Sequence, residues 1–222
     1  MERKGAQKKD LTGEKKKISK KQANDLKKKL FAEYRNIWEV TGKEERENVF
    51  AFADEYRSFL DMGKTERECV ILSVEAYEEL GFVDIDSVDK LKPGMKVYKA
   101  IKGKGFIAAV VGKKHIKEGM NLLGAHIDSP RLDLKPSPVY EENDIVFLKT
   151  HYYGGIKKYQ WVSIPLAMHG IVVRKDGSVL TVNIGEKDDD PVFTVTDLLP
   201  HLGNEQMSKK ATEVIKGEDL NV

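Results

Sequence analysis

The run MNLLGAHI, residues 120–127, constrains the possible fold more than any other segment. It is apolar at both odd and even positions, which is typical of a strand covered on two faces rather than of a strand with one face in water. Polar residues follow at once, with His126 and Asp128 ahead of Ser129 and Pro130. We therefore predict a central strand in an α/β sheet, with a ligand site beyond the carboxyl end of that strand.

The segments before this strand predict helices and further strands. Apolar residues at spacings of three and four predict two amphipathic helices within 23–60, separated near Gly42, and a third over 65–80. The third helix has the pattern of a capping box, Thr65 with Glu68, and Gly81 follows as a stop signal. Two short apolar runs, 95–100 and 106–111, predict strands between glycine-rich turns.

From about residue 138 onward the sequence is rich in segments typical of β-strands, and a second and mainly β module is predicted to begin there. Its expected strands are 144–149, 160–164, 167–173 and 178–184, with a hairpin turn at Lys175-Asp176-Gly177. Two short helices are expected at 197–201 and 205–215. The expected organisation is a lysine-rich tail over 1–22, an α/β part over 23–137 and the β-rich module over 138–222.

Charge and hydropathy limit the possible partners. The formal net charge of +2 hides a basic segment, residues 1–29, whose net charge is +8, while the remainder carries −6. The segment has a single arginine and no aromatic residue, so it lacks the groups that read bases or stack on them, and no specific nucleic acid is expected. No apolar run suits a membrane span or a secretory signal. We expect no membrane partner and a cytoplasmic location.

The spacing of His126 and Asp128 suits a metal site. On a strand, residues i and i+2 face the same side, so the imidazole and the carboxylate project together. A metal-binding histidine needs its second ring nitrogen fixed by an acceptor, and a nearby carboxylate can provide one. A structural hydrogen-bonded pair at a strand end has the same spacing, so the two residues alone leave both interpretations open.

Longer strings carry a resemblance to a known family. The segments GAHIDSPRLDLKPSPVYEEND, KTHYYGG, WVSIPLAMHGIVV and PVFTVTDLLPHLGNEQMSKK resemble the N-terminal half of the aspartyl aminopeptidase / aminopeptidase I family of di-zinc metallopeptidases. The resemblance runs from about Asp25 to the last residue. It implies that His126 is a zinc ligand and that Asp128 orients the metal site. It also implies that His201 reaches the active site of a neighbouring subunit to hold substrate.

The resemblance further implies the architecture and the partners. In this family a β-rich dimerisation domain is inserted into the α/β catalytic domain, and subunits assemble through it into homo-oligomers. A complete active site holds two Zn²⁺ ions, or other divalent metals, and acts on peptide substrates. The family's other metal ligands and its glutamate base lie beyond the inserted domain, and this sequence stops inside that domain. We therefore expect the chain alone to be inactive, and the alternative function is a non-catalytic oligomerisation partner of a full-length aminopeptidase.

Other candidate residues are interpreted structurally. Glu141-Glu142 and the acidic run 188–190 are expected in loops, His115 at the surface, and Cys69 in the interior as a small apolar residue. His151 and His169 are expected to be core or hydrogen-bonded histidines. The preference for an acidic or an apolar first residue of the substrate stays open.

Overall fold

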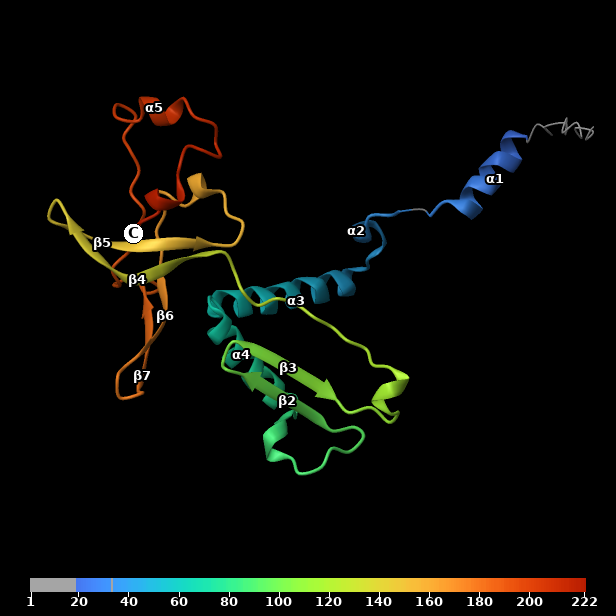
Figure 1. Ribbon diagram of the computed structural model, residues 1–222. Helices are drawn as coiled ribbons and strands as arrows, with labels where there is room; N and C mark the ends of the chain where they lie inside the picture. Colours follow the sequence, from blue (N-terminus) through green and yellow to red (C-terminus); the bar gives the residue numbers. More distant parts are fainter. Residues whose placement is uncertain (1–18, 33) are drawn as a thin grey trace, which may run out of the picture. The chain divides into compact units, whose positions relative to one another are not determined.

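The computed structural model describes residues 19–32 and 34–222, a mixture of helices and sheets (Figure 1). The chain divides into two compact units, residues 1–53 and 54–222. The predicted mixed α/β class is confirmed at this level. No helix in the described ranges is long and apolar enough to cross a membrane.

The first unit consists of short helical segments. Helix α1, Lys20–Leu30, begins with the capping box of Ser19 and Gln22 and ends in three lysines, which suit the negative end of the helix dipole. A single turn, α2 (Ile37–Val40), follows, and then α3 (Lys43–Met62) runs on into the second unit. The prediction of two helices is therefore wrong in number. Most of the predicted tail, 1–22, lies outside the described residues.

The second unit continues with helix α4, Glu66–Glu79, and a three-stranded sheet. The side chain of Thr65 accepts from the backbone N–H of Glu68, and the Glu68 carboxylate accepts from the Thr65 N–H, which confirms the capping box. The strands are β1 (Val83–Asp84), β2 (Lys96–Ile101) and β3 (Gly105–Val110), with β2 in the middle, parallel to β1 and antiparallel to β3. A small core lies between helix and sheet: Cys69, Val70, Val97 and Tyr98.

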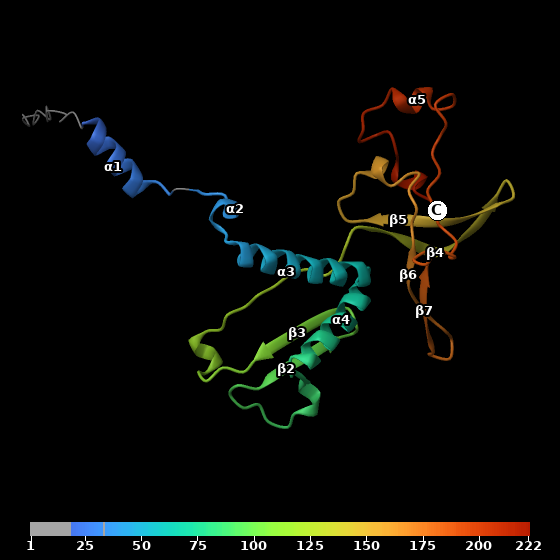
Figure 2. The same ribbon diagram turned by 180° about the vertical axis from the view of Figure 1, so that it is seen from behind.

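The predicted central strand is wrong for this structure. After the 3-10 helix η2 (Ile116–Glu118), residues 119–130 form no regular element and run as an open trace to β4 (Figure 2). Leu122 is 83% exposed and Leu123 is 98% exposed. A strand buried on two faces needs neighbouring strands and covering layers on both sides. The described ranges supply neither for this segment, since β3 pairs only with β2.

The β-rich part begins with a long hairpin. Strand β4, Arg131–Glu142, pairs antiparallel with β5, Ile145–Tyr153, and the register shifts between Leu134 and Val139. Two prolines in that interval lack the backbone N–H that a regular ladder requires, so the irregularity falls there. The expected loop at Glu141-Glu142 is wrong. Both residues belong to β4 and pair with Val146 and Ile145 at the end of the ladder, although they are exposed.

A second hairpin follows, β6 (Met168–Val173) with β7 (Val179–Ile184), and it confirms two predicted strands and their turn. The predicted strand 160–164 is instead the 3-10 helix η3 (Lys158–Gln160) and an isolated bridge at Val162. Residues 197–201 are not helical, and the helix predicted over 205–215 shrinks to one turn, α5 (Asn204–Met207).

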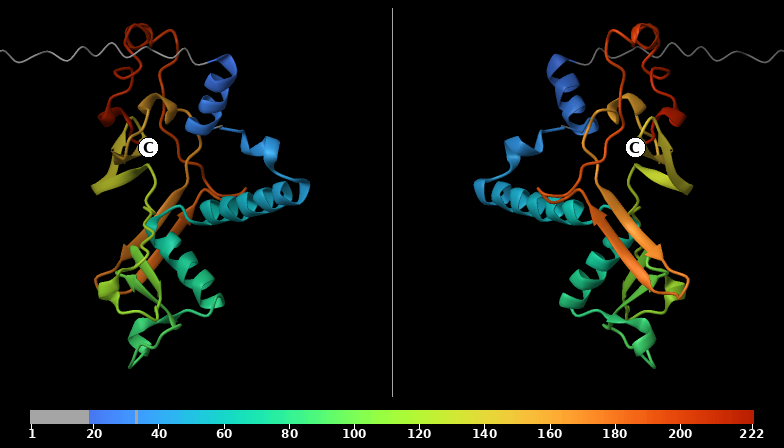
Figure 3. Two further views of the ribbon diagram at one scale, coloured as in Figure 1. Left: turned by 90° about the vertical axis from the view of Figure 1, so that its right-hand side faces the viewer. Right: turned by 90° about the vertical axis from the view of Figure 1, so that its left-hand side faces the viewer.

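The C-terminal residues close the core of the β-rich part. After the 3-10 helix η4 (Gly217–Asp219), Val222 exchanges two backbone hydrogen bonds with Leu148 of β5, so the C-terminus lies against that strand in both views of Figure 3. The hydroxyl of Thr150 donates to the carbonyl of Leu220. The buried centre of this core is Val195, Ile215 and Leu220.

Candidate metal-binding site

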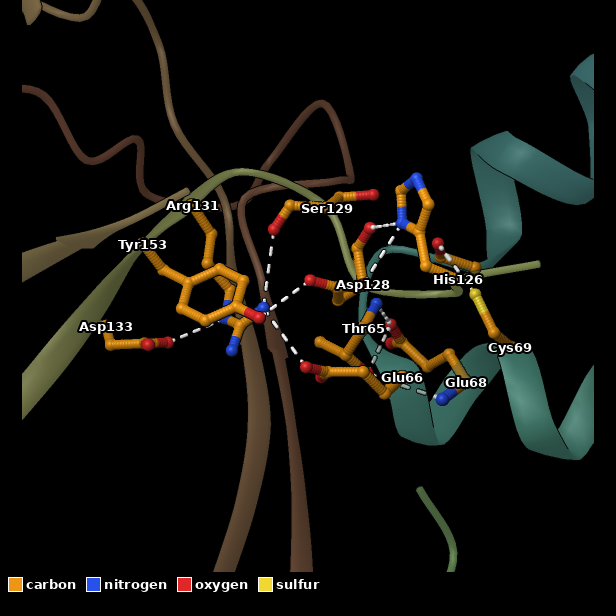
Figure 4. Close-up of polar contacts among 11 residues, drawn as sticks. Thr65, Glu66, Glu68, Cys69, His126, Asp128, Ser129, Arg131, Asp133 and Tyr153 are labelled. Atoms are coloured by element: carbon orange, nitrogen blue, oxygen red, sulfur yellow. Dashed lines mark hydrogen bonds and ion pairs between the residues drawn. The ribbon is translucent and has the colours of Figure 1, made fainter. Parts of the chain in front are cut away.

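His126 and Asp128 lie together at the end of the exposed segment (Figure 4). The Nδ1 atom of His126 is 3.1 Å from Oδ1 of Asp128 and 3.0 Å from the backbone oxygen of the same residue. The His126 side chain is 85% exposed, so it points to solvent rather than into an aliphatic core. The predicted pairing of these two side chains is confirmed, although they do not sit on a strand.

The second oxygen of the Asp128 carboxylate binds Tyr153, the last residue of β5. The Tyr153 hydroxyl donates to Oδ2 of Asp128 at 2.7 Å. This hydrogen bond is the main cause that holds the pKa of Asp128 below its ordinary value, with contributions from backbone N–H and from His126. Asp128 is therefore an ionised acceptor at neutral pH.

Arg131 ties the Asp128–Tyr153 pair to helix α4. It faces Tyr153 across the β4–β5 ladder, and its guanidinium lies 4.1 Å from the centre of the Tyr153 ring. Its Nε donates to Asp133 at 2.7 Å, and its Nη1 lies 3.1 Å from Glu66 in the first turn of α4. The side chains of Arg131 and Glu66 are 27% and 18% exposed, so this ion pair is partly shielded from water. The network therefore extends over α4, β4 and β5 (Figure 4).

A glycine bend allows the two ends of the network to meet. Gly154 has φ of +82°, a conformation that L-residues adopt with strain, and a Cβ added there would lie 3.5 Å from the α-carbon of Pro130. The backbone bends at Gly154, the first residue of the Gly154-Gly155 pair. It turns the chain directly after Tyr153, where the chain also passes the segment that carries Asp128.

The chemistry of these groups fits one metal ligand with its orienting partner. A backbone oxygen and a carboxylate both accept, so Nδ1 of His126 carries the proton and Nε2 keeps its lone pair free for a cation. Zinc sites need three or four protein ligands. No group of three or more His, Cys, Asp or Glu side chains in the described ranges is placed to hold a metal ion. The described ranges thus offer His126 as a single candidate ligand, with Asp128 as its orienting partner.

His201 is not brought to this pair. It lies exposed in a turn before α5, and no hydrogen bond or ion pair within the described ranges joins it to His126 or Asp128. Its predicted role in a neighbouring subunit stays a prediction.

The remaining candidates have structural surroundings. His115 is exposed and caps η2, Cys69 is buried, and the acidic run 188–190 lies in a turn, as predicted. His169 is hydrogen-bonded on both sides, to Glu68 and Glu186, at 2.8 Å each. The prediction for His151 is wrong, because its side chain is exposed and stacks on Tyr152.

Sequence reasoning missed Tyr153 and Arg131. Both stand in quoted strings, HYYGG and DSPR, but their meeting depends on the antiparallel register that places residue 131 opposite residue 153. The glycine pair marks where β5 ends, but no sequence pattern shows which residue of the preceding strand lies opposite Tyr153.

Comparison with known proteins finds close similarities. The family profile described as "Aminopeptidase I zinc metalloprotease (M18)" matches residues 59–220. A probable M18 family aminopeptidase 1 of Clostridium acetobutylicum is 50% identical over 197 residues, which cover 87% of this chain and 42% of the relative.

Solved structures agree with the sequence comparison. The M18 aminopeptidase of Thermotoga maritima superimposes with a TM-score of 0.78 at 45% identity, over 86% of this chain and 41% of that one. Aminopeptidase I of Clostridium acetobutylicum gives a TM-score of 0.75 at 50% identity, over 87% and 43%. The chain spans about two fifths of the length of these relatives.

Proposed function

The chain belongs to the aminopeptidase I zinc metalloprotease family (M18), and we propose that it forms the N-terminal part of a zinc-dependent centre that removes N-terminal residues from peptides. The observation that carries this proposal is the exposed His126 imidazole, whose Nδ1 is held by Asp128 while Nε2 is open. Zinc in such a centre supplies Lewis-acid activation of the scissile carbonyl and of water.

The residues of this chain have distinct roles in the proposal. His126 holds one zinc through Nε2, and Asp128 fixes the orientation of the imidazole and raises its basicity as a ligand. The remaining ligands of a two-zinc centre and the general base are proposed to come from the part of the relatives that this chain does not span. By itself the chain is then a weak metal binder without peptidase activity.

Residues 138–222, within the β-rich part, are proposed to be a portion of the inserted dimerisation domain. Through it, the chain would form homo-oligomers and bring His201 to a neighbouring subunit's substrate. The exposed position of His201 supports a role outside the chain's own site.

Complementation tests the proposed activity. The purified chain, mixed with zinc or cobalt and aspartyl- or leucyl-p-nitroanilide, is expected to show no turnover. Addition of the polypeptide that corresponds to the remaining part of the Clostridium acetobutylicum relative is expected to produce activity. His126→Ala should abolish that activity, whereas His115→Ala, at an exposed histidine that caps η2, should leave it unchanged. Robust turnover by the chain alone, or restored activity that persists in His126→Ala, would contradict the ligand assignment.

A second function, that of a non-catalytic oligomerisation partner, is favoured by one observation. The β-rich part has its own buried core, and its C-terminal residues pair with β5, so it presents a formed surface without the part of the relatives that this chain does not span. Mixing the chain with a full-length relative and measuring subunit mass and activity tests this function. Mixed oligomers with reduced activity support it, and unmixed species contradict it.

A further inference from the structure

The two oxygens of the Asp128 carboxylate have different partners. Oδ1 of Asp128 faces Nδ1 of His126, while Oδ2 accepts from the Tyr153 hydroxyl at 2.7 Å. A carboxylate that is held at one oxygen only can rotate about its Cβ–Cγ bond. The hydrogen bond from Tyr153 restricts that rotation and leaves Oδ1 directed at the imidazole.

Tyr153 is itself held in place. The guanidinium of Arg131 covers its ring at 4.1 Å, and Arg131 is in turn fixed by Asp133 and Glu66. The ring therefore has a charged, hydrogen-bonded group on one face that keeps the hydroxyl over Asp128. The chain of contacts begins on helix α4 and ends at the exposed imidazole (Figure 4).

We propose that Tyr153, supported by Arg131, is a positioning residue that locks His126 in the Nδ1–H tautomer and so directs Nε2 at the cation. The cation part of this inference rests on the proposed function, whereas the tautomer part rests only on the contacts of the chain. Asp128 alone is expected to hold the tautomer less well. Without the Tyr153 hydroxyl its carboxylate can rotate, and water can then take the place of the imidazole at Oδ1.

The tautomer is measurable on the chain as it stands. Long-range proton–nitrogen correlation spectra of ¹⁵N-histidine-labelled protein, recorded above the pH at which imidazoles protonate, separate protonated from unprotonated ring nitrogens. For His126 we expect a protonated Nδ1 and an unprotonated Nε2. Tyr153→Phe keeps the ring and removes the hydroxyl, and it should shift His126 toward the Nε2–H tautomer. Arg131→Gln should shift it in the same direction by less.

A matched control is available on the same strand. Tyr152 is adjacent, but its ring packs against the core of the β-rich part instead of Asp128. Tyr152→Phe therefore removes the same hydroxyl group and should leave the His126 tautomer unchanged. The other histidines give internal controls in each spectrum, and the amide spectrum reports whether each variant is folded.

Metal binding gives the second readout. Titration with Zn²⁺, followed at each histidine ring separately, should move the His126 signals, and Tyr153→Phe should weaken this response by roughly tenfold, as the loss of a partner behind a metal ligand commonly does. Tyr152→Phe should not change it.

The outcomes separate the two assignments. An Nε2–H tautomer in the unmodified chain, or an unchanged tautomer and zinc response in folded Tyr153→Phe, would overturn the role of Tyr153. A tautomer that depends on Tyr153 together with no zinc response at His126 would keep the positioning role and refute the proposed zinc function. Both effects together support both.

Discussion

The β-rich part, 131–222, and the segment that precedes it, 119–130, differ in how they treat apolar side chains. Val195 and Leu220 are fully buried, with partners contributed by β4, β5 and the C-terminal residues. Leu122 and Leu123 are almost fully exposed, although they lie in the apolar run 120–127. Burial therefore follows from the presence of a covering partner in the chain and not from hydrophobicity alone.

The same difference explains what each region can do. The network of Asp128, Tyr153 and Arg131 is complete because every donor and acceptor it needs lies within 66–153. Around His126, by contrast, the described ranges hold no group of three or more His, Cys, Asp or Glu side chains that could bind a metal ion. The network of Asp128, Tyr153 and Arg131 is therefore formed by this chain's own residues.

The largest expected effect concerns the buried and the exposed leucines. Leu220→Ala removes a fully buried side chain from the core of the β-rich part, and the loss of contacts together with the cavity should cost about 2–5 kcal/mol of the free energy of unfolding. Leu123→Ala makes the same change at an exposed position and should stay within about 0.5 kcal/mol of the original. Denaturant unfolding measures both. Equal losses in the two variants would show that Leu123 is covered in solution.

The next effect concerns the link between helix α4 and the hairpin. Arg131→Ala removes a charge-assisted hydrogen bond to Asp133 and a partly shielded ion pair with Glu66, and should destabilise the chain by about 1–3 kcal/mol. Lys43→Ala, which removes the exposed Lys43–Glu47 pair on α3, is the control and should cost under about 1 kcal/mol. Unfolding curves at low and high salt test this, and similar losses for both variants would contradict a special role for Arg131.

The third effect tests the bend after Tyr153. Gly154→Ala places a side chain at φ of +82°, which should cost about 1–2 kcal/mol. Gly155 is free of that constraint and has open space where a Cβ would stand, so Gly155→Ala is the matched control and should cost less. Thermal unfolding of the two single variants measures the difference. A reversed order would mean that the bend does not depend on residue 154.

The sequence predicts an element well when residues close to it in the chain determine it, and poorly when distant strands do. The capping box of Thr65 and Glu68 and the hairpin turn at 175–177 are local, and both were predicted. A strand over 120–127 would need adjacent strands to pair with. No strand in the described ranges pairs with this segment. Strand β4 was missed because Pro136 and Pro138 interrupt its pattern, yet a register shift accommodates them.

The candidate site divides in the same way. His126 and Asp128 are two residues apart, so their pairing follows from sequence spacing even without a strand. Tyr153 is 25 residues from Asp128 and reaches it only through the register of β4 and β5. No periodicity in the sequence reports such a contact. His201 shows the remaining limit, since its predicted role depends on a second subunit.

The smallest expected effect is a pH dependence at the start of α4. Burial raises the pKa of Glu68, but hydrogen bonds from His169 and Thr65 outweigh it, so the pKa lies below the ordinary value of 4.5. A carboxyl whose folded pKa is lowered stabilises the fold above its unfolded pKa, and this contribution is lost as pH falls through the folded pKa. Stability should therefore fall as the pH drops below about 4.5. Glu68→Gln should flatten this part of the profile, by less than about 1 kcal/mol.

The control for this prediction lies in the same helix. Glu75→Gln changes a carboxyl that lies on α4, away from the capping box, so it should leave the slope of stability against pH unchanged. Urea unfolding at pH 3.5, 4.5 and 6 for the three proteins measures the slopes. An equal slope in the chain and in Glu68→Gln would show that His169 and Thr65 do not favour the ionised carboxylate. The contact between α4 and the β6–β7 hairpin would then stabilise the fold through packing rather than charge, which would make it resemble the buried core around Leu220 more than the ionic network around Arg131.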